Sequence, residues 1–108
     1  MRFDESTRTR FRAHIMTRGL ELATLLAQVL AGKRPPSAEA LLAAKPWKRP
    51  EDVLRMALDQ VERRRELLDA DDDRFGRCDV CGVDVGELAL GEMPWADRCA
   101  EHAPKAVP

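Results

Sequence analysis

The 108-residue sequence lacks the features of secreted and membrane proteins. It has three cysteines, and an odd number argues against a framework of disulfides and for a reducing compartment. No stretch approaches the roughly twenty apolar residues of a membrane span, and the residues after Met1 lack the apolar run of a signal peptide. We therefore expect a cytoplasmic protein, with at most one domain and a modest core.

The sequence also shows no set of residues suited to act together in catalysis. The serines and threonines have no partnered histidine, and His14 lies among arginines on a helix face that we expect to be exposed. The carboxylates do not lie in the apolar contexts that would shift their pKa values toward acid–base work. We therefore do not expect an enzyme, although a zinc-dependent enzyme or a redox switch stays open as a third hypothesis. Either would need an open metal position or an exposed, reactive thiolate.

Charge is unevenly distributed, although the net charge is only −1. Residues 1–50 carry ten basic and four acidic side chains, whereas residues 51–108 carry eight basic and fifteen acidic ones. A basic first half is compatible with nucleic-acid binding. It is equally compatible with a solvated face that docks on an acidic surface.

Apolar residues recur at helical spacing between residues 7 and 31. Intervals of four, seven, three and four residues mark one face of a helix. Asp4 or Ser6 can cap its start, and Gly32, followed by two prolines, stops it. Arg18 occupies the missing position of the face, where its side chain should reach along the surface to water. The face consists of Phe11, Ile15, Leu22, Leu25 and Val29.

A second long helix is predicted to begin at Pro50, which suits a first helical position. It should end near Asp69 or Ala70, because the acidic run at residues 71–73 is unfavourable at a helix C-terminus. Each helix needs a partner to cover its apolar stripe. The fold class is therefore mainly α, an antiparallel two-helix hairpin (coiled coil) with a small C-terminal zinc finger. The stripe of the second helix consists of Leu54, Ala57 or Leu58, Val61 and Leu68.

The connection between the helices, residues 32–50, is rich in proline and basic side chains and forms the tip of the hairpin. Within it, a short capped helix can run from Ser37 to Ala44, and its Leu41 and Leu42 would pack back on the hairpin. Trp47 lies among cations and can anchor a partner or stack on a base, or it can fold back onto the two leucines. The candidate partner-binding residues are Lys33, Arg34, Lys45, Trp47, Lys48 and Arg49.

Two matched ligand pairs follow the second helix. Cys78 and Cys81 are separated by two residues, and Cys99 and His102 repeat that spacing after an intervening loop. Two such pairs are what a tetrahedral structural zinc site needs, one pair for each edge of the ion. Four protein ligands leave no position for water, so the zinc should be structural. The alternative is a set of unpaired thiols with His102 on the surface, but chance rarely produces two matched pairs.

The residues between the ligands resemble those of the TraR/DksA zinc-finger family. The shared pattern has an aromatic residue and a glycine before the first ligand pair, a glycine after it, and a Leu-x-x-x-Pro-x-Ala run before the second. The resemblance covers about 28 residues, and the hairpin that leads into the finger agrees with the family's general architecture. The matching residues are Phe75, Gly76, Gly82, Val85, Leu90, Pro94, Ala96 and Asp97.

The resemblance implies a bacterial or phage transcription regulator that binds RNA polymerase directly, rather than promoter DNA. The tip of the hairpin would enter the secondary channel of the polymerase. The chain would divide into the helical hairpin at residues 1–74, with its tip at 32–50, and the zinc finger and tail at 75–108. The alternative is a small zinc-containing adaptor or nucleic-acid-binding protein that uses the basic N-terminal half.

This chain departs from the family pattern at several positions. His102 replaces the usual last cysteine, and Ala89 stands where a basic residue often precedes the leucine. The acidic Asp-x-x-Asp-x-Ala motif of the tip is absent. Met93 and Ala103 occupy the positions of basic contacts to guanosine tetraphosphate, and neither can pair with a pyrophosphate. We therefore do not expect this alarmone to bind.

Overall fold

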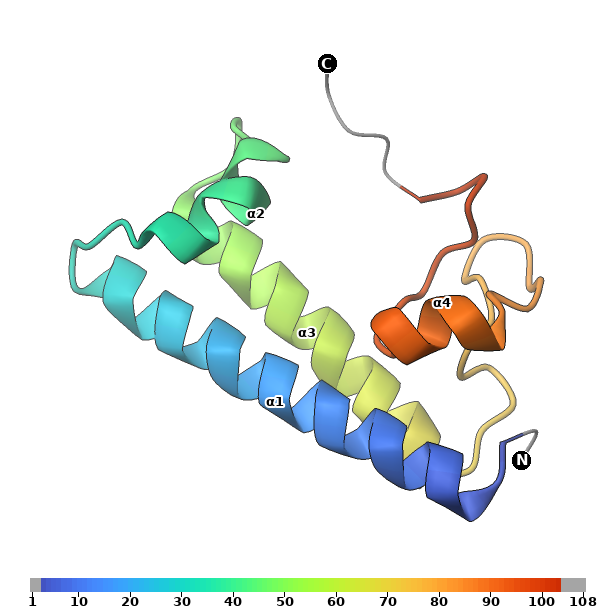
Figure 1. Cartoon of the computed structure of the whole chain (residues 1–108). Helices are drawn as coiled ribbons and strands as arrows, with labels where there is room; N and C mark the ends of the chain where they lie inside the picture. Colours follow the sequence, from blue (N-terminus) through green and yellow to red (C-terminus); the bar gives the residue numbers. More distant parts are fainter. Residues whose placement is uncertain (1–2, 104–108) are drawn as a thin grey trace.

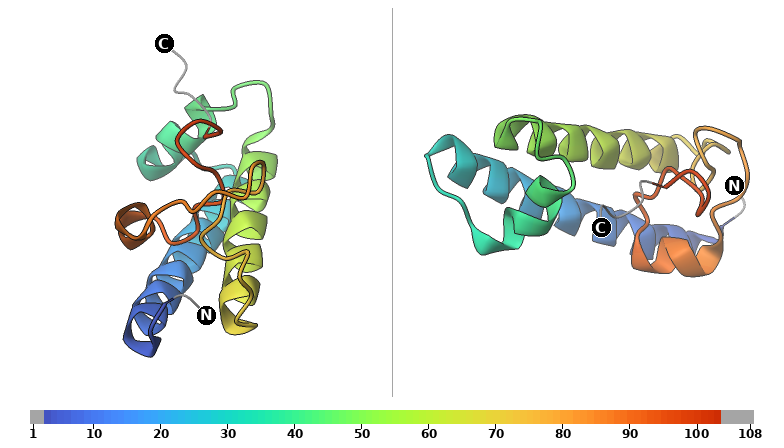
Figure 2. Two further views of the ribbon diagram at one scale, coloured as in Figure 1. Left: turned by 90° about the vertical axis from the view of Figure 1, so that its right-hand side faces the viewer. Right: turned by 90° about the horizontal axis from the view of Figure 1, so that it is seen from above.

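The computed structural model describes residues 3–103, and within that range the chain is mainly helical, as predicted, and has no β-strand. The elements follow in the order α1 (Glu5–Leu30), the 3-10 turn η1 (Pro36–Ala38), α2 (Glu39–Ala43), α3 (Pro50–Asp69) and α4 (Glu87–Glu92). Helices α1 and α3 lie side by side and run in opposite directions (Figure 1). The segment with η1 and α2 connects them at one end, and residues 75–103 lie at the other (Figures 1 and 2).

The ends of α1 are stabilised by the residues that the sequence indicates. The carboxylate of Asp4 accepts a hydrogen bond of 2.7 Å from the backbone N–H of Thr7, which satisfies a free donor of the first turn. At the other end Gly32 takes a φ of +83°, and Lys33 donates to the carbonyl of Gln28. This is the Schellman arrangement, in which a left-handed glycine ends the helix.

The ends of α3 also agree with the prediction, because the helix begins at Pro50 and ends at Asp69. The acidic residues Glu51 and Asp52 lie in its first turn, where they face the positive end of the helix dipole. Asp71 follows with a φ of +61°, which turns the chain away from the helix axis.

The core lies between α1 and α3 and continues under the C-terminal segment. The predicted face of α1 is buried except for the half-buried Val29, and it meets the stripe of α3. At the lower end Phe75 packs among Phe3 and Phe11 with ring centroids 6.1 and 6.0 Å away. Leu90 of α4 is also fully buried. The segment after α3 therefore shares one core with the two helices.

The connection at residues 31–49 differs from the prediction in one respect. The short helix does not begin with a capping serine, because Pro36 takes the first position of the 3-10 turn and leaves Ser37 inside it. Neither η1 nor α2 has a side-chain cap. Leu42 is buried and Leu41 is half-buried, so this segment does pack back on the long helices. None of the helices in the described residues has the length and apolar character needed to cross a membrane.

Replacing Leu54 by alanine tests the core between the long helices. Leu54 is fully buried, so we expect the free energy of unfolding to fall by about 2–5 kcal/mol. Met56 lies two residues away on the same helix and is 42% exposed, so Met56→Ala should change it by less than about 0.5 kcal/mol. Denaturant unfolding of the two variants, followed by circular dichroism, makes the comparison. Equal losses of unfolding free energy in the two variants would contradict the position of the core between α1 and α3.

Candidate metal centre

Four side chains converge at one point of the C-terminal segment. The sulfurs of Cys78, Cys81 and Cys99 and a ring nitrogen of His102 all lie within 4.8 Å of one another. Among the described residues this is the one cluster of three or more such groups able to hold a metal ion. The structure thus brings together all four predicted ligands, and they are positioned to bind one ion.

The distances between the ligand atoms test whether a tetrahedral ion fits. Bond lengths of about 2.3 Å to sulfur and 2.0 Å to nitrogen give tetrahedral edges of about 3.8 Å between sulfurs and 3.5 Å between sulfur and nitrogen. The Cys81 and Cys99 sulfurs are 3.8 Å apart, and the Cys78 sulfur lies 3.6 Å from His102 Nδ1. The Cys99 sulfur is closer to the same nitrogen, at 3.1 Å. The shell has the size that a tetrahedral ion requires.

Two tight backbone turns present the ligands. In the first, the N–H of Gly82 donates to the carbonyl of Cys78 at 2.9 Å, and the N–H of Cys78 donates to Val83. Gly82 has a φ of +74°, a conformation that a side chain would strain, which explains a glycine directly after the second cysteine. In the second turn, the N–H groups of His102 and Ala103 both donate to the carbonyl of Cys99.

The same turns change the acidity of the thiols. Burial raises the pKa of the Cys78 thiol, but backbone N–H groups, that of Cys99 foremost, donate to its sulfur and lower the pKa to about 6. The N–H of Val83 lowers the pKa of the Cys81 thiol, but desolvation and the two neighbouring sulfurs raise it by more. Of these two thiols, Cys78 therefore more readily supplies a thiolate to an incoming cation.

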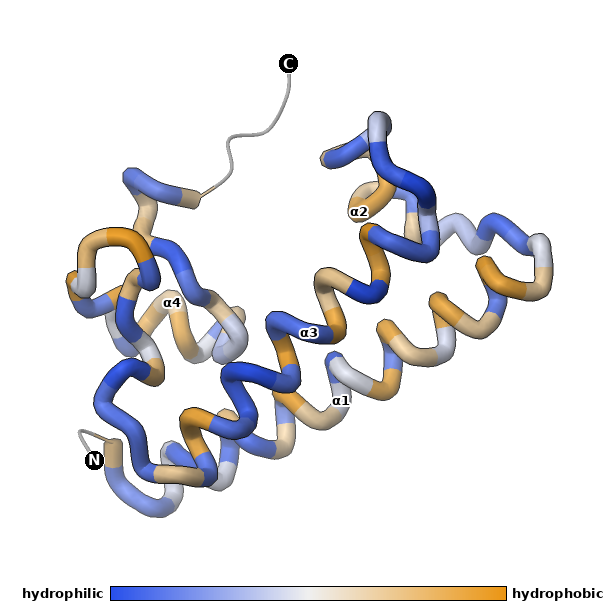
Figure 3. Tube along the Cα trace, turned by 180° about the vertical axis from the view of Figure 1, so that it is seen from behind, coloured by the Kyte–Doolittle hydropathy of each residue, from blue (hydrophilic) through white to orange (hydrophobic). Residues whose placement is uncertain are grey.

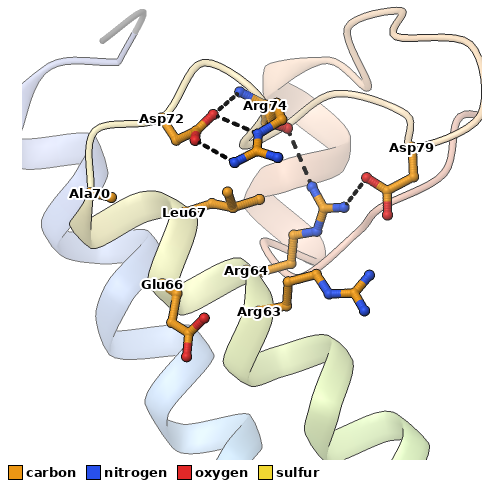
Figure 4. Close-up of a pocket in the computed structure, with 8 residues that line it drawn as sticks. All are labelled: Arg63, Arg64, Glu66, Leu67, Ala70, Asp72, Arg74 and Asp79. Carbon is orange, nitrogen blue, oxygen red and sulfur yellow. Dashed lines mark hydrogen bonds and ion pairs between the residues drawn. The ribbon is translucent and has the colours of Figure 1, made fainter.

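A buried arginine of α3 supports the first turn. Arg64 is 1% exposed, and its guanidinium pairs with the carboxylate of Asp79, which lies between the two cysteines of the turn (Figure 4). The same guanidinium donates to the carbonyl of Arg74 at 3.3 Å (Figure 4). The helix thus holds the chain on both sides of Cys78.

A glutamine one turn earlier on α3 supports the other half of the cluster. The amide of Gln60 donates to Asp97 Oδ1 at 3.0 Å and to the carbonyl of Trp95 at 3.2 Å. The carbonyl of Asp97 in turn accepts from the N–H of Asp79 at 2.8 Å, which joins the two turns. The ligand pairs are therefore set relative to each other by α3 as well as by their own loops.

Helix α1 contacts the same segment through Trp95. The indole meets the exposed His14 edge to face, with centroids 5.1 Å apart, and the guanidinium of Arg18 lies 5.3 Å from the ring. Arg18 is half-buried, as expected for its place in the apolar face, and also pairs with Glu21. The indole therefore shields the one polar member of the α1 face.

The candidate partner-binding residues all lie on the connection between α1 and α3. Trp47 is 72% exposed and does not fold back onto the buried Leu42. Arg34 pairs with Glu39, and Arg49 pairs with Asp52, which holds the pKa of that carboxyl below its usual value. The lysines of the set form no ion pair within residues 3–103; Lys33 and Lys48 are exposed and Lys45 is half-buried.

Sequence reasoning missed the supporting roles of Gln60 and Arg64. A signal for Arg64 was present, because it lies three residues after Val61 and four before Leu68, which is a core position of the α3 stripe. An arginine at a core position needs a carboxylate or carbonyl partner. The sequence offers many acids, and only the folded structure selects Asp79.

Comparison with models of known protein families, with curated proteins and with solved structures found no match. What can be said of the site therefore comes from its own residues and geometry.

Exchanging Arg64 for methionine tests the support of the cluster. The change removes the ion pair with Asp79 and the hydrogen bond to Arg74, and we expect a loss of about 2 kcal/mol in unfolding free energy. Metal affinity should fall as well, because groups that orient the ligands contribute to binding. Its neighbour Arg63, which has no ion pair in the described residues, provides the control Arg63→Met. Titration with a chromophoric chelator measures both affinities, and equal values would contradict the role of Arg64.

Proposed function

We propose that Cys78, Cys81, Cys99 and His102 hold one structural zinc ion, and that the chain is a transcription regulator that binds bacterial RNA polymerase directly. The architecture that we propose is an antiparallel coiled-coil hairpin on a zinc finger, with the tip at residues 32–50. The proposal is supported by three independent features: the donor set, the residues between the ligands, and the exposed tip.

The donor set favours zinc over other metals. Three thiolates and one imidazole suit a soft or borderline ion in tetrahedral geometry, and calcium and magnesium prefer oxygen ligands. Four protein ligands occupy all positions of such a site, so the ion would stabilise the fold rather than activate water. Zinc bound to three thiolates also fits a reducing compartment, and we propose a cytoplasmic location for this reason.

The residues between the ligands support the resemblance to the TraR/DksA family through their burial. Phe75, Leu90 and Pro94 are all nearly or completely buried, and Phe75 and Leu90 contribute to the core that joins the finger to α1 and α3. These three residues, which belong to the family pattern, thus have packing roles in this chain. Exposed residues would have no such role.

The tip carries the functional part of the proposal, and Trp47 is the observation on which it depends. An indole that is 72% exposed, on the connection at the opposite end of the long helices from residues 75–103, is suited to bury itself in a partner (Figure 1). The basic side chains beside it would meet an acidic surface. The absence of basic groups at Met93 and Ala103 fits a regulator that does not bind guanosine tetraphosphate.

Exchanges at His102 test the zinc site. His102→Cys should keep one zinc per chain, because cysteine is an equally good ligand, whereas His102→Ala should weaken binding by at least about tenfold. Elemental analysis identifies the metal, and competition with a chelator gives its affinity. Removal of zinc should also unfold residues 75–103, with loss of helical circular dichroism. Equal affinity in all three proteins would exclude His102 as a ligand.

A pull-down with purified bacterial RNA polymerase tests the proposed partner. Zinc-loaded protein should retain the core enzyme, and Trp47→Ala should weaken retention by about tenfold or more, as expected for a hot-spot aromatic. Leu88→Ala is the matched control, because Leu88 is 86% exposed and lies on α4, far along the chain from the tip. Retention that is absent, or that Trp47→Ala does not change, would contradict the proposal. Steeply salt-dependent binding to free DNA or RNA would support the nucleic-acid alternative instead.

A further inference from the structure

Helix α1 has a second apolar face, which residues 3–103 leave uncovered. Its six residues follow one another at intervals of three, four, three, four and three, the spacing of the a and d positions of a coiled coil. All six are exposed, with Met16 at 56%, Leu20 at 71% and Leu30 at 59%. We call this face the outer seam, and it consists of Ala13, Met16, Leu20, Ala23, Ala27 and Leu30.

The outer seam lies on the opposite side of α1 from its core contacts. At 100° per residue the seam is centred about 150° away from the face that includes Ile15 and Leu22. The contacts of His14 and Arg18 with Trp95 lie on the core side, so the C-terminal segment as far as residue 103 leaves the outer seam free. Hydrophobic residues accordingly recur along α1 from residue 11 to its C-terminal end (Figure 3), more of them than one buried face requires.

We propose that the outer seam pairs with the outer seam of a second copy of this chain, in an antiparallel two-fold dimer. The argument is the order of large and small residues. With the two-fold axis midway between Leu20 and Ala23, the facing pairs are Leu20 with Ala23, Met16 with Ala27, and Leu30 with Ala13. Each large side chain meets an alanine in every layer, and each layer joins an a position to a d position, as antiparallel pairing requires.

A parallel pair of the same helices would pack poorly. Each residue would then face its own copy, with alanine on alanine in three layers and two large side chains in the other three. The distance between the helix axes would then have to change from layer to layer. Close-packed helices instead keep a nearly constant separation. The antiparallel arrangement instead gives every layer the same combined volume.

The residues beside the outer seam also favour self-association. One flank carries Thr17 and Thr24, and these would face each other across the dimer. The other flank carries Gly19 and Leu26 and borders the chain's own α3, because a Cβ at Gly19 would lie 3.7 Å from Val61 and Leu26 packs against the core. None of these four residues is charged, so two identical seams meet without like-charge repulsion.

The size of the contact sets the expected affinity. The seam extends over about 26 Å of helix, and three large side chains from each copy fill it. This is small for a permanent dimer, so we expect a reversible one with a dissociation constant of about 1–100 µM.

Sedimentation of the zinc-loaded full chain tests the dimer over a concentration range of about 1–500 µM. Monomer should give way to dimer across this range, and Leu20→Glu should weaken the dimer by at least about 100-fold, because each dimer would bury two unpaired carboxylates. Leu88→Glu adds the same charge at a more exposed leucine outside the seam and should leave the dimer unchanged. Circular dichroism checks that both variants keep their helices. A monomer at all concentrations, or a dimer that Leu20→Glu does not weaken, would overturn the proposal.

A pair of double variants tests the antiparallel register. In Thr17→Glu/Thr24→Lys, opposite charges face each other across the two-fold axis, so the dimer should be tighter than in Thr17→Glu/Thr24→Glu by about tenfold at low salt. The difference should shrink in 1 M salt, because exposed charges are screened. In a parallel dimer these positions do not face each other, and equal affinities would therefore exclude the proposed arrangement. Because purified chain alone is used, the outcome is independent of whether RNA polymerase binds.

Discussion

A buried guanidinium connects the two parts of this small chain. Arg64 leaves α3 at a position that an apolar residue would normally fill, and its charge is compensated by Asp79 and by the carbonyl of Arg74. Because a buried charge without a partner costs several kcal/mol, the chain around Cys78 must stay where it satisfies Arg64. The ligand turns are thereby held against the long helices, and a metal ion bound there stabilises the whole molecule rather than one loop.

The metal cluster matters because the core alone is modest. The two long helices bury one face of each, and helices of this kind depend on packing for their stability. The three phenylalanines at residues 3, 11 and 75 extend that core into the C-terminal segment, which otherwise has neither a strand nor a long helix among its described residues. A cation that drew both ligand turns together would help to keep Phe75 and Leu90 buried. Metal binding and core packing would therefore reinforce each other.

The sequence predicted the long elements and the ligands well, because both depend on local spacing. Helical periodicity and end signals placed α3 from Pro50 to Asp69, and ligand spacing identified the four side chains that the structure brings into position to bind one metal ion. The sequence was less informative about structural features that depend on contacts between residues far apart in the chain. The partner of Arg64 could not be read from the sequence, because several acidic residues were equally available. The exposure of Trp47 could not be read either, because the indole could equally have packed on the two leucines of the connection. Ser37 failed as a cap because Pro36 starts the turn one residue earlier.

The two faces of α1 explain why a helix with so many apolar residues can belong to such a small domain. One face is used within the chain, and its single polar member, Arg18, is covered by Trp95. The outer seam has no such covering within the part of the chain that the structure describes, and leaving Leu20 in water lowers solubility without stabilising the fold. An apolar residue at every a and d position over this length is costly unless something buries it. Its self-complementary order of large and small side chains is what a second copy of the same helix would select, whereas an unrelated partner would have no need of this symmetry.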